Sequence, residues 1–112
     1  MYKLVRDNIP ELMKKSDIVC NHAIIQNDEL YVAFLKEKLI EEVNEFLSCK
    51  GNDNPIAELA DITCVVHALY TLAGISDDEF KNIYMSKVES NGDFTKRIIM
   101  FMPDTPADNE VK

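Results

Sequence analysis

The 112-residue sequence has no tryptophan and only three glycines, four prolines and three cysteines. Its cysteines, Cys20, Cys49 and Cys64, are odd in number and widely spaced, which is typical of reduced thiols and not of a disulfide framework. A zinc site would have to combine Cys20 with His22 and Cys64 with His67, and neither pair has the spacing of a structural zinc site. We therefore expect Cys64 to be a small core residue and His67 to be a core or interface histidine.

Positive charge and long apolar runs are also scarce. Twelve lysines and arginines face twenty acidic residues, which gives a net charge of −8. This charge repels polyanions and argues against binding of DNA or RNA polymers, whereas a small phosphorylated ligand held through a metal ion remains compatible. No apolar run approaches the roughly 18 residues of a membrane span, and residues 1–7 lack the apolar stretch of a signal peptide. We expect a cytoplasmic protein without membrane association.

Apolar periodicity and capping signals predict four helices, over about residues 7–15, 27–50, 55–74 and 76–89. The second helix has the clearest apolar stripe, which consists of Val32, Leu35, Leu39, Val43 and Phe46. The fourth is expected to turn inward the side chains of Phe80, Ile83, Tyr84 and Val88. The second and third helices are joined by a short loop, so we expect them to form an antiparallel hairpin.

Two stretches outside these helices are harder to assign. Residues 18–25 are predicted to be irregular or a short strand, and residues 97–101 to be a strand or a docked extended segment. The helical pattern as a whole predicts an all-α fold in one domain over residues 1–102, with residues 103–112 as a flexible tail. A chain of this length buries a modest core, so we expect a homo-oligomer that shares core surface.

The third predicted helix is apolar almost all the way round, and only Glu58 and Asp61 carry full charge in it. Their spacing of three places both on one helix face, and Glu42 and Glu45 repeat this spacing on the preceding helix. At a rise of about 1.5 Å per residue, an antiparallel hairpin sets Glu45 opposite Glu58 and Glu42 opposite Asp61.

Four convergent carboxylates repel one another unless a cation lies between them. A hard cation with oxygen ligands, Mg²⁺ or Mn²⁺, resolves this repulsion, so the spacing predicts a metal site. The alternative is purely structural: Glu58 interacts with the dipole of its helix start, and Lys38 forms surface pairs with Glu41 and Glu42. That alternative accounts neither for Asp61 nor for the matched depths of the two pairs.

The acidic pattern also resembles a known family. The segment Glu41-Glu42-Val43-Asn44-Glu45 is separated by twelve residues from Glu58-Leu59-Ala60-Asp61. This pattern resembles the EExxE…ExxD signature of the all-α nucleoside triphosphate pyrophosphohydrolases, which include MazG-like, dimeric dUTPase-like and phosphoribosyl-ATP pyrophosphohydrolase-like proteins. Residues 3–11, KLVRDNIPE, are similar to the KLVRDxIPE opening of small single-domain MazG-like proteins, and residues 38–43 and 94–98 resemble other segments of that group. The chain departs from the family at residues 91–94, which read NGDF where such proteins often read RGGF.

The resemblance implies hairpins that dimerise or tetramerise into a four-helix-bundle-type core. It also implies a Mg²⁺ site, for which Mn²⁺ is the alternative, with the ligands Glu42, Glu45, Glu58 and Asp61. The implied reaction converts a nucleoside triphosphate and water into a nucleoside monophosphate and pyrophosphate. Hydrolysis of phosphoribosyl-ATP is one alternative, and a non-catalytic helical module that binds a nucleotide or a protein partner is another.

Two further roles complete the expected site. Glu41 or Glu45 is the candidate general base that accepts a proton from the attacking water. Cations expected to bind the substrate phosphates are Arg6, Lys38, Lys87, Lys96 and Arg97, with Lys3 as a further candidate. The arginines rank first because a guanidinium binds phosphate oxygens in a bidentate manner. Each of these cations is alternatively a surface charge or one that ties the fold together.

Overall fold

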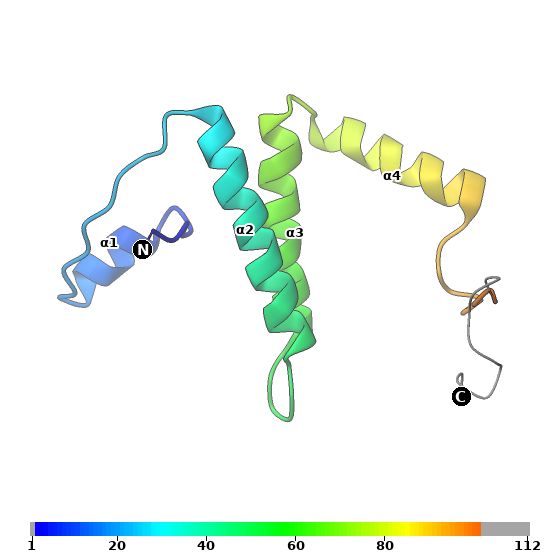
Figure 1. Ribbon diagram of the computed structural model, residues 1–112, viewed down its shortest axis with the longest axis horizontal. Coiled ribbons are helices and arrows are strands. Elements are labelled where there is room, and N and C mark those ends of the chain that lie inside the picture. Colours follow the sequence, from blue (N-terminus) through cyan, green and yellow to red (C-terminus); the bar gives the residue numbers. More distant parts are fainter. Residues whose placement is uncertain (1, 102–112) are drawn as a thin grey trace. The chain divides into compact units, whose positions relative to one another are not determined.

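The computed structural model describes residues 2–101, and within that range the chain is all-helical and contains no strand. Its helices are α1 (Ile9–Lys15), α2 (Asp28–Leu47), α3 (Pro55–Leu72) and α4 (Asp77–Asn91), shown in Figure 1. The predicted all-α class is confirmed. The strand alternatives for residues 18–25 and 97–101 are wrong, because both stretches are irregular. The predicted tail, residues 103–112, lies outside the described residues.

Side chains fix the starts of α3 and α4 much as the capping signals predict. The Asn54 side-chain oxygen accepts hydrogen bonds from the backbone N–H groups of Ile56 and Ala57, at 3.1 and 3.2 Å. At the start of α4, Ser76 Oγ accepts from the Glu79 backbone N–H at 3.1 Å, and Glu79 Oε1 accepts from the Ser76 N–H at 3.3 Å. This reciprocal pair is a capping box, which satisfies two backbone donors that a helix start leaves free.

The predicted helix ends are less accurate. Helix α2 ends at Leu47, three residues before the predicted end, because the loop that follows has its own hydrogen bonds. In that loop the Lys50 backbone N–H donates to Asp53 Oδ2 at 2.8 Å, and Gly51 has a positive φ of 58°. A side-chain acceptor of this kind competes with the helix for a backbone donor. Helix α4 ends at Asn91, just before Gly92, which has a φ of 80°.

Helices α2 and α3 lie side by side and run antiparallel, as predicted (Figure 1). Their contact holds the two buried apolar side chains of the described residues, Leu35 and Val65, at 3% and 8% exposure. Much apolar surface stays uncovered in the single chain. On α4, Ile83 and Tyr84 are 49% and 58% exposed, so the expectation that they turn into a core is wrong for the chain by itself.

Contacts divide the chain into two compact units, Met1–Phe80 and Lys81–Lys112. The hairpin belongs to the first unit. The prediction that no apolar stretch reaches the length of a membrane span is wrong for α3, which by length and composition is long and apolar enough and has Val65 as its one buried residue. A core helix of a water-soluble protein passes the same test, so length and composition alone do not assign α3 to a membrane.

Candidate metal centre

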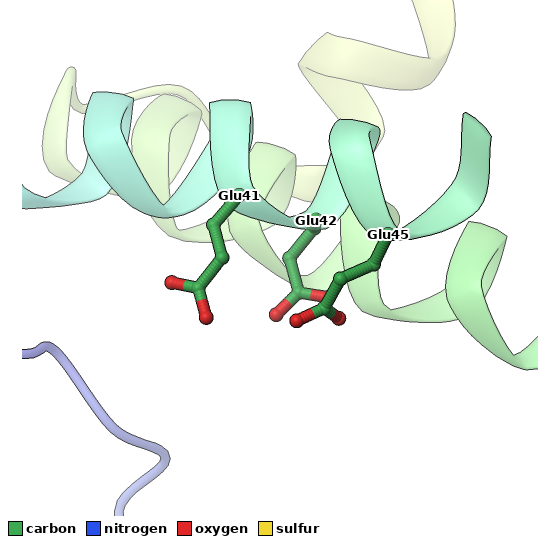
Figure 2. A group of neighbouring side chains, drawn as sticks. All are labelled: Glu41, Glu42 and Glu45. Atoms are coloured by element: carbon green, nitrogen blue, oxygen red, sulfur yellow. The ribbon is translucent and has the colours of Figure 1, made fainter. Parts of the chain in front are cut away.

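Carboxylates from the two hairpin helices converge where α2 passes α3. Glu42, Glu58 and Asp61 each offer an oxygen, and these three oxygens lie within 4.8 Å of one another. Glu41, Glu42 and Glu45 form a second group with the same spacing limit, and their side chains extend from one side of α2 (Figure 2). Glu42 belongs to both groups and links them. We call the five carboxylates together the acidic cluster.

The arrangement follows from two spacings and one loop. Residues three apart share a helix face, and the short loop between Leu47 and Pro55 brings the two acidic faces to the same level. The grouping differs in one detail from the predicted pairing. Glu58 groups with Glu42 and Asp61, whereas Glu45 groups with the glutamates of its own helix.

Burial distinguishes Glu42 from the other acids. It is 7% exposed, and among the described residues it is the one charged residue that is buried. Its Oε2 atom, and Oε2 of Glu58, are buried and have no hydrogen-bond partner among the described residues. Burial raises the pKa of Glu42, the neighbouring Glu45 carboxyl raises it further, and Lys38 acts in the opposite direction. Buried polar atoms normally have partners, so these two oxygens indicate an acceptor site for a donor or a cation.

One lysine reaches into the acidic cluster from its own helix. Lys38 Nζ lies 3.4 Å from Glu41 Oε2 and 3.4 Å from Glu42 Oε1, and its side chain is only 17% exposed. The structural alternative treated these contacts as surface pairs, but the Glu42 contact is largely buried. Lys38, predicted to bind phosphate, therefore lies among the acids and neutralises part of their charge.

The N-terminal segment brings two more cations to the acidic cluster. Lys3 Nζ lies 3.1 Å from Glu41 Oε1, and Arg6 Nη2 lies 2.6 Å from Asp61 Oδ1. The hydrogen bond from Lys3 lowers the pKa of Glu41. The sequence identified both residues as candidate cations, but it carried no signal for their acidic partners, because the paired residues lie 38 and 55 positions apart.

The remaining predicted phosphate ligands are Lys87 on α4 and, beyond it, Lys96 and Arg97. All three belong to the second unit, so their role stays a prediction. Residues 91–94 read NGDF instead of RGGF, and the aspartate in this segment forms local hydrogen bonds. Asp93 Oδ1 accepts hydrogen bonds from the Thr95 backbone N–H at 3.0 Å and from Thr95 Oγ1 at 2.8 Å, which lowers the pKa of Asp93.

The cysteines and histidines do not take part in these groups. Cys64 is exposed, contrary to the prediction of a core residue, and its sulfur accepts a 3.5 Å hydrogen bond from Arg6. His67 is also exposed, with Nε2 3.1 Å from Asp77 Oδ1. Within residues 2–101, the side chains close enough to share a metal ion are all carboxylates. An oxygen-only set with two unsatisfied buried oxygens fits a hard divalent cation of the Mg²⁺, Mn²⁺ or Ca²⁺ type, and not zinc.

No family model, no curated protein and no solved structure matches the chain.

Proposed function

We propose that this chain is a nucleoside triphosphate pyrophosphohydrolase that uses Mg²⁺ or Mn²⁺. Glu42, Glu58 and Asp61 would hold the ion, and Glu45, on the same side of α2 as Glu42 (Figure 2), would stay free to act as a base. The observation that carries the proposal is the buried Glu42 carboxylate, which has an oxygen without a hydrogen-bond partner and lies beside two carboxylates of the facing helix. The resemblance of residues 41–61 to the EExxE…ExxD signature supplies the reaction.

When bound, the metal ion would neutralise charge on the phosphates and lower the pKa of a water molecule that it binds. The protein must supply a base for the proton of that water, and the two candidates differ in their surroundings. Both oxygens of Glu41 are engaged, Oε1 by Lys3 and Oε2 by Lys38, and its pKa is lowered. A carboxylate that is held ionised by two cations is a weak base. Glu45 is exposed and forms no ion pair with a described residue, so we assign it the role of base.

Binding of a polyanion to an acidic chain requires local positive charge. The net charge is −8, so the field of the whole protein opposes the approach of a triphosphate. Lys3, Arg6 and Lys38 are the cations that contact the acidic cluster. Arg6 is the strongest candidate for a phosphate contact, because its guanidinium is exposed and can bind two oxygens at once.

We also propose that two or four copies associate in the cytoplasm and cover the exposed face of α3. The apolar residues on that face include Ile56, Ala57, Leu59 and Ala60. A second hairpin laid against this face would bury them and complete a four-helix-bundle-type core, while Glu58 and Asp61 stay directed to α2.

A screen for pyrophosphate release tests the reaction. The wild-type protein is incubated with Mg²⁺ or Mn²⁺ and each canonical or oxidised nucleoside triphosphate, ribose and deoxyribose forms alike, and with phosphoribosyl-ATP. We expect release from at least one nucleoside triphosphate. Release from phosphoribosyl-ATP alone would favour that alternative substrate, and nucleotide binding without release would favour a non-catalytic module.

Matched variants connect any activity to the acidic cluster. Glu42→Gln and Asp61→Asn should abolish release and keep the helical circular dichroism spectrum. Glu37→Gln and Asp78→Asn are the controls, because these acids are exposed and lie outside both carboxylate groups. Equal activity in the wild type and in Glu42→Gln would contradict the proposed site.

A further inference from the structure

Two cations of the N-terminal segment contact opposite sides of the acidic cluster. Lys3 pairs with Glu41 on α2, and Arg6 pairs with Asp61 on α3. The segment thus connects to both helices of the hairpin through charged side chains. Arg6 is the more informative of the two, because its partner is one of the proposed metal ligands.

We propose that Arg6 is an exchangeable counter-ion of Asp61: a divalent metal ion competes with its guanidinium for the carboxylate, and the displaced guanidinium then binds substrate phosphate. This inference rests on the proposed function, since it takes Asp61 to be a metal ligand. It adds a specific exchange, in which the same arginine opposes binding of the metal and favours binding of the triphosphate.

Charge and distance favour this competition. Arg6 Nη2 lies 2.6 Å from Asp61 Oδ1, which is the distance of a direct charge-assisted hydrogen bond. A divalent ion bound to the same carboxylate would lie close to this guanidinium, and the two positive charges would repel each other. Arg6 therefore has to move away from Asp61 for the metal to bind without this repulsion.

Exposure allows Arg6 to move, as it also allows Lys3, whose side chain is 62% exposed, but of these two only Arg6 pairs with a proposed metal ligand. The Arg6 and Asp61 side chains are 57% and 37% exposed, and ion pairs in contact with water are weak. The Lys38 and Glu42 side chains are only 17% and 9% exposed, so their ion pair is largely shielded from water and costs more to separate. Compared with Lys38, Arg6 has the shorter distance to its carboxylate, 2.6 Å against 3.4 Å, and its ion pair costs less free energy to separate because it is more exposed.

The surroundings of Arg6 also give it room to turn. It lines an open hollow of about 1050 Å³ beside the N-terminal segment and α1, together with Leu4, Val5, Pro10 and Tyr31. A guanidinium released from Asp61 can rotate along the border of this hollow while its backbone stays in place. A phosphate group on the metal would attract the released guanidinium, which binds phosphate oxygens in a bidentate manner.

Binding measurements test the two halves of the exchange separately. Isothermal titration with Mn²⁺ alone compares the wild type with Arg6→Gln, Arg6→Lys and Lys15→Gln. Lys15 is an exposed cation of α1 with no ion pair to a described residue, so its variant measures the effect of losing one positive charge at a distance. We expect Arg6→Gln to bind Mn²⁺ about threefold tighter than Lys15→Gln does, which is the size expected for removal of one exposed ion pair.

The second titration adds inorganic tripolyphosphate to protein saturated with Mn²⁺. Here we expect Arg6→Gln to bind about tenfold more weakly than Lys15→Gln, because a charged hydrogen-bond donor to phosphate is lost. Arg6→Lys should lie between the two. The opposite signs of the two effects distinguish an exchangeable counter-ion from a residue that only supports the fold, which would alter both affinities in the same direction.

A nuclear magnetic resonance measurement follows the exchange in the wild type, and a variant serves only to assign the resonance. The Arg6 Nε–H resonance, assigned by its loss in Arg6→Lys, should shift when Mg²⁺ is added and shift again with tripolyphosphate. A resonance that Mg²⁺ leaves in place would overturn the inference, as would equal Mn²⁺ affinities of Arg6→Gln and Lys15→Gln. If the wild type and Glu42→Gln bind Mn²⁺ equally, the metal site itself is wrong, and the proposed function fails with it.

Discussion

Lys38 Nζ lies 3.4 Å from Glu42 Oε1 on the same helix, and both side chains are largely buried. The same ammonium group also contacts Glu41 at 3.4 Å, so one positive charge is divided between two carboxylates. The second oxygen of Glu42 has no hydrogen-bond partner among the described residues. The metal-free hairpin therefore contains a buried negative charge that is only partly compensated, and several properties of the protein should depend on it.

The first prediction concerns stability without metal. In EDTA, Glu42→Gln should raise the free energy of unfolding by about 1 kcal/mol, because a neutral amide is less costly to bury than a poorly compensated carboxylate. Lys38→Gln should lower it by about 1–2 kcal/mol, because it leaves the Glu42 charge without its partner. Urea denaturation at one fixed protein concentration measures both. The exposed Lys36→Gln is the control, and a loss of stability in Glu42→Gln would contradict this account.

The second prediction is a pH dependence with a defined sign. The folded-state pKa of Glu42 lies above its ordinary value of 4.5, mainly because of burial. In the pH range between these two values the folded state binds more protons than the unfolded state, so the free energy of unfolding falls as pH rises. Well below pH 4.5 the Glu42 carboxyl is protonated in both states, so it no longer makes the free energy of unfolding depend on pH.

The stability difference between Glu42→Gln and the wild type should therefore be small near about pH 4 and grow as the pH rises toward about 7. Urea denaturation in EDTA across this range measures it. Using the difference between the two proteins removes the contributions of the other titrating groups. A difference that stays constant with pH would show that the Glu42 carboxyl titrates normally.

The third prediction concerns stabilisation by metal. Mg²⁺ or Mn²⁺ at about ten times its Kd should add about 1.4 kcal/mol to the free energy of unfolding and raise the Tm by about 6–10 °C. Glu58→Gln and Asp61→Asn should lose most of this shift, whereas Glu37→Gln should keep it. Thermal melts with metal and with EDTA measure the effect. Equal shifts in all four proteins would indicate nonspecific binding of cations to an acidic surface.

The fourth prediction separates the two candidate bases. Glu45→Gln should lower kcat for pyrophosphate release by about 10²–10⁴-fold, the usual contribution of a general base. Glu41→Gln should have a smaller effect, because Glu41 is engaged by Lys3 and Lys38. The pH profile provides the control: only Glu45→Gln should lose the acidic limb of kcat. A larger loss in Glu41→Gln would reverse the assignment.

Local signals in the sequence predicted the hairpin well. Asn54 and Pro55 mark the start of α3, and the acids at spacings of three lie together where the two helices meet. The sequence did not predict the Arg6–Asp61 pair, because no local pattern connects residues 55 positions apart. It also placed Ile83 and Tyr84 in a core that the single chain does not form. Apolar periodicity identifies a helix face that is suited to burial, but it does not say whether the same chain supplies a surface to bury it.

The last prediction identifies what covers α3. Ile56 is 70% exposed near the start of this helix, and burying such a side chain contributes about 1.5–3 kcal/mol. In a symmetric dimer Ile56→Glu removes this contribution from both copies, so the dissociation constant should rise by at least 100-fold. Light scattering after size exclusion should show a dimer or tetramer for the wild type and a shift toward monomer for Ile56→Glu. Val19→Glu, at an exposed apolar residue outside the hairpin, should leave the assembly intact. A wild-type monomer that sediments with lipid vesicles would show that lipid covers α3 instead of a second copy.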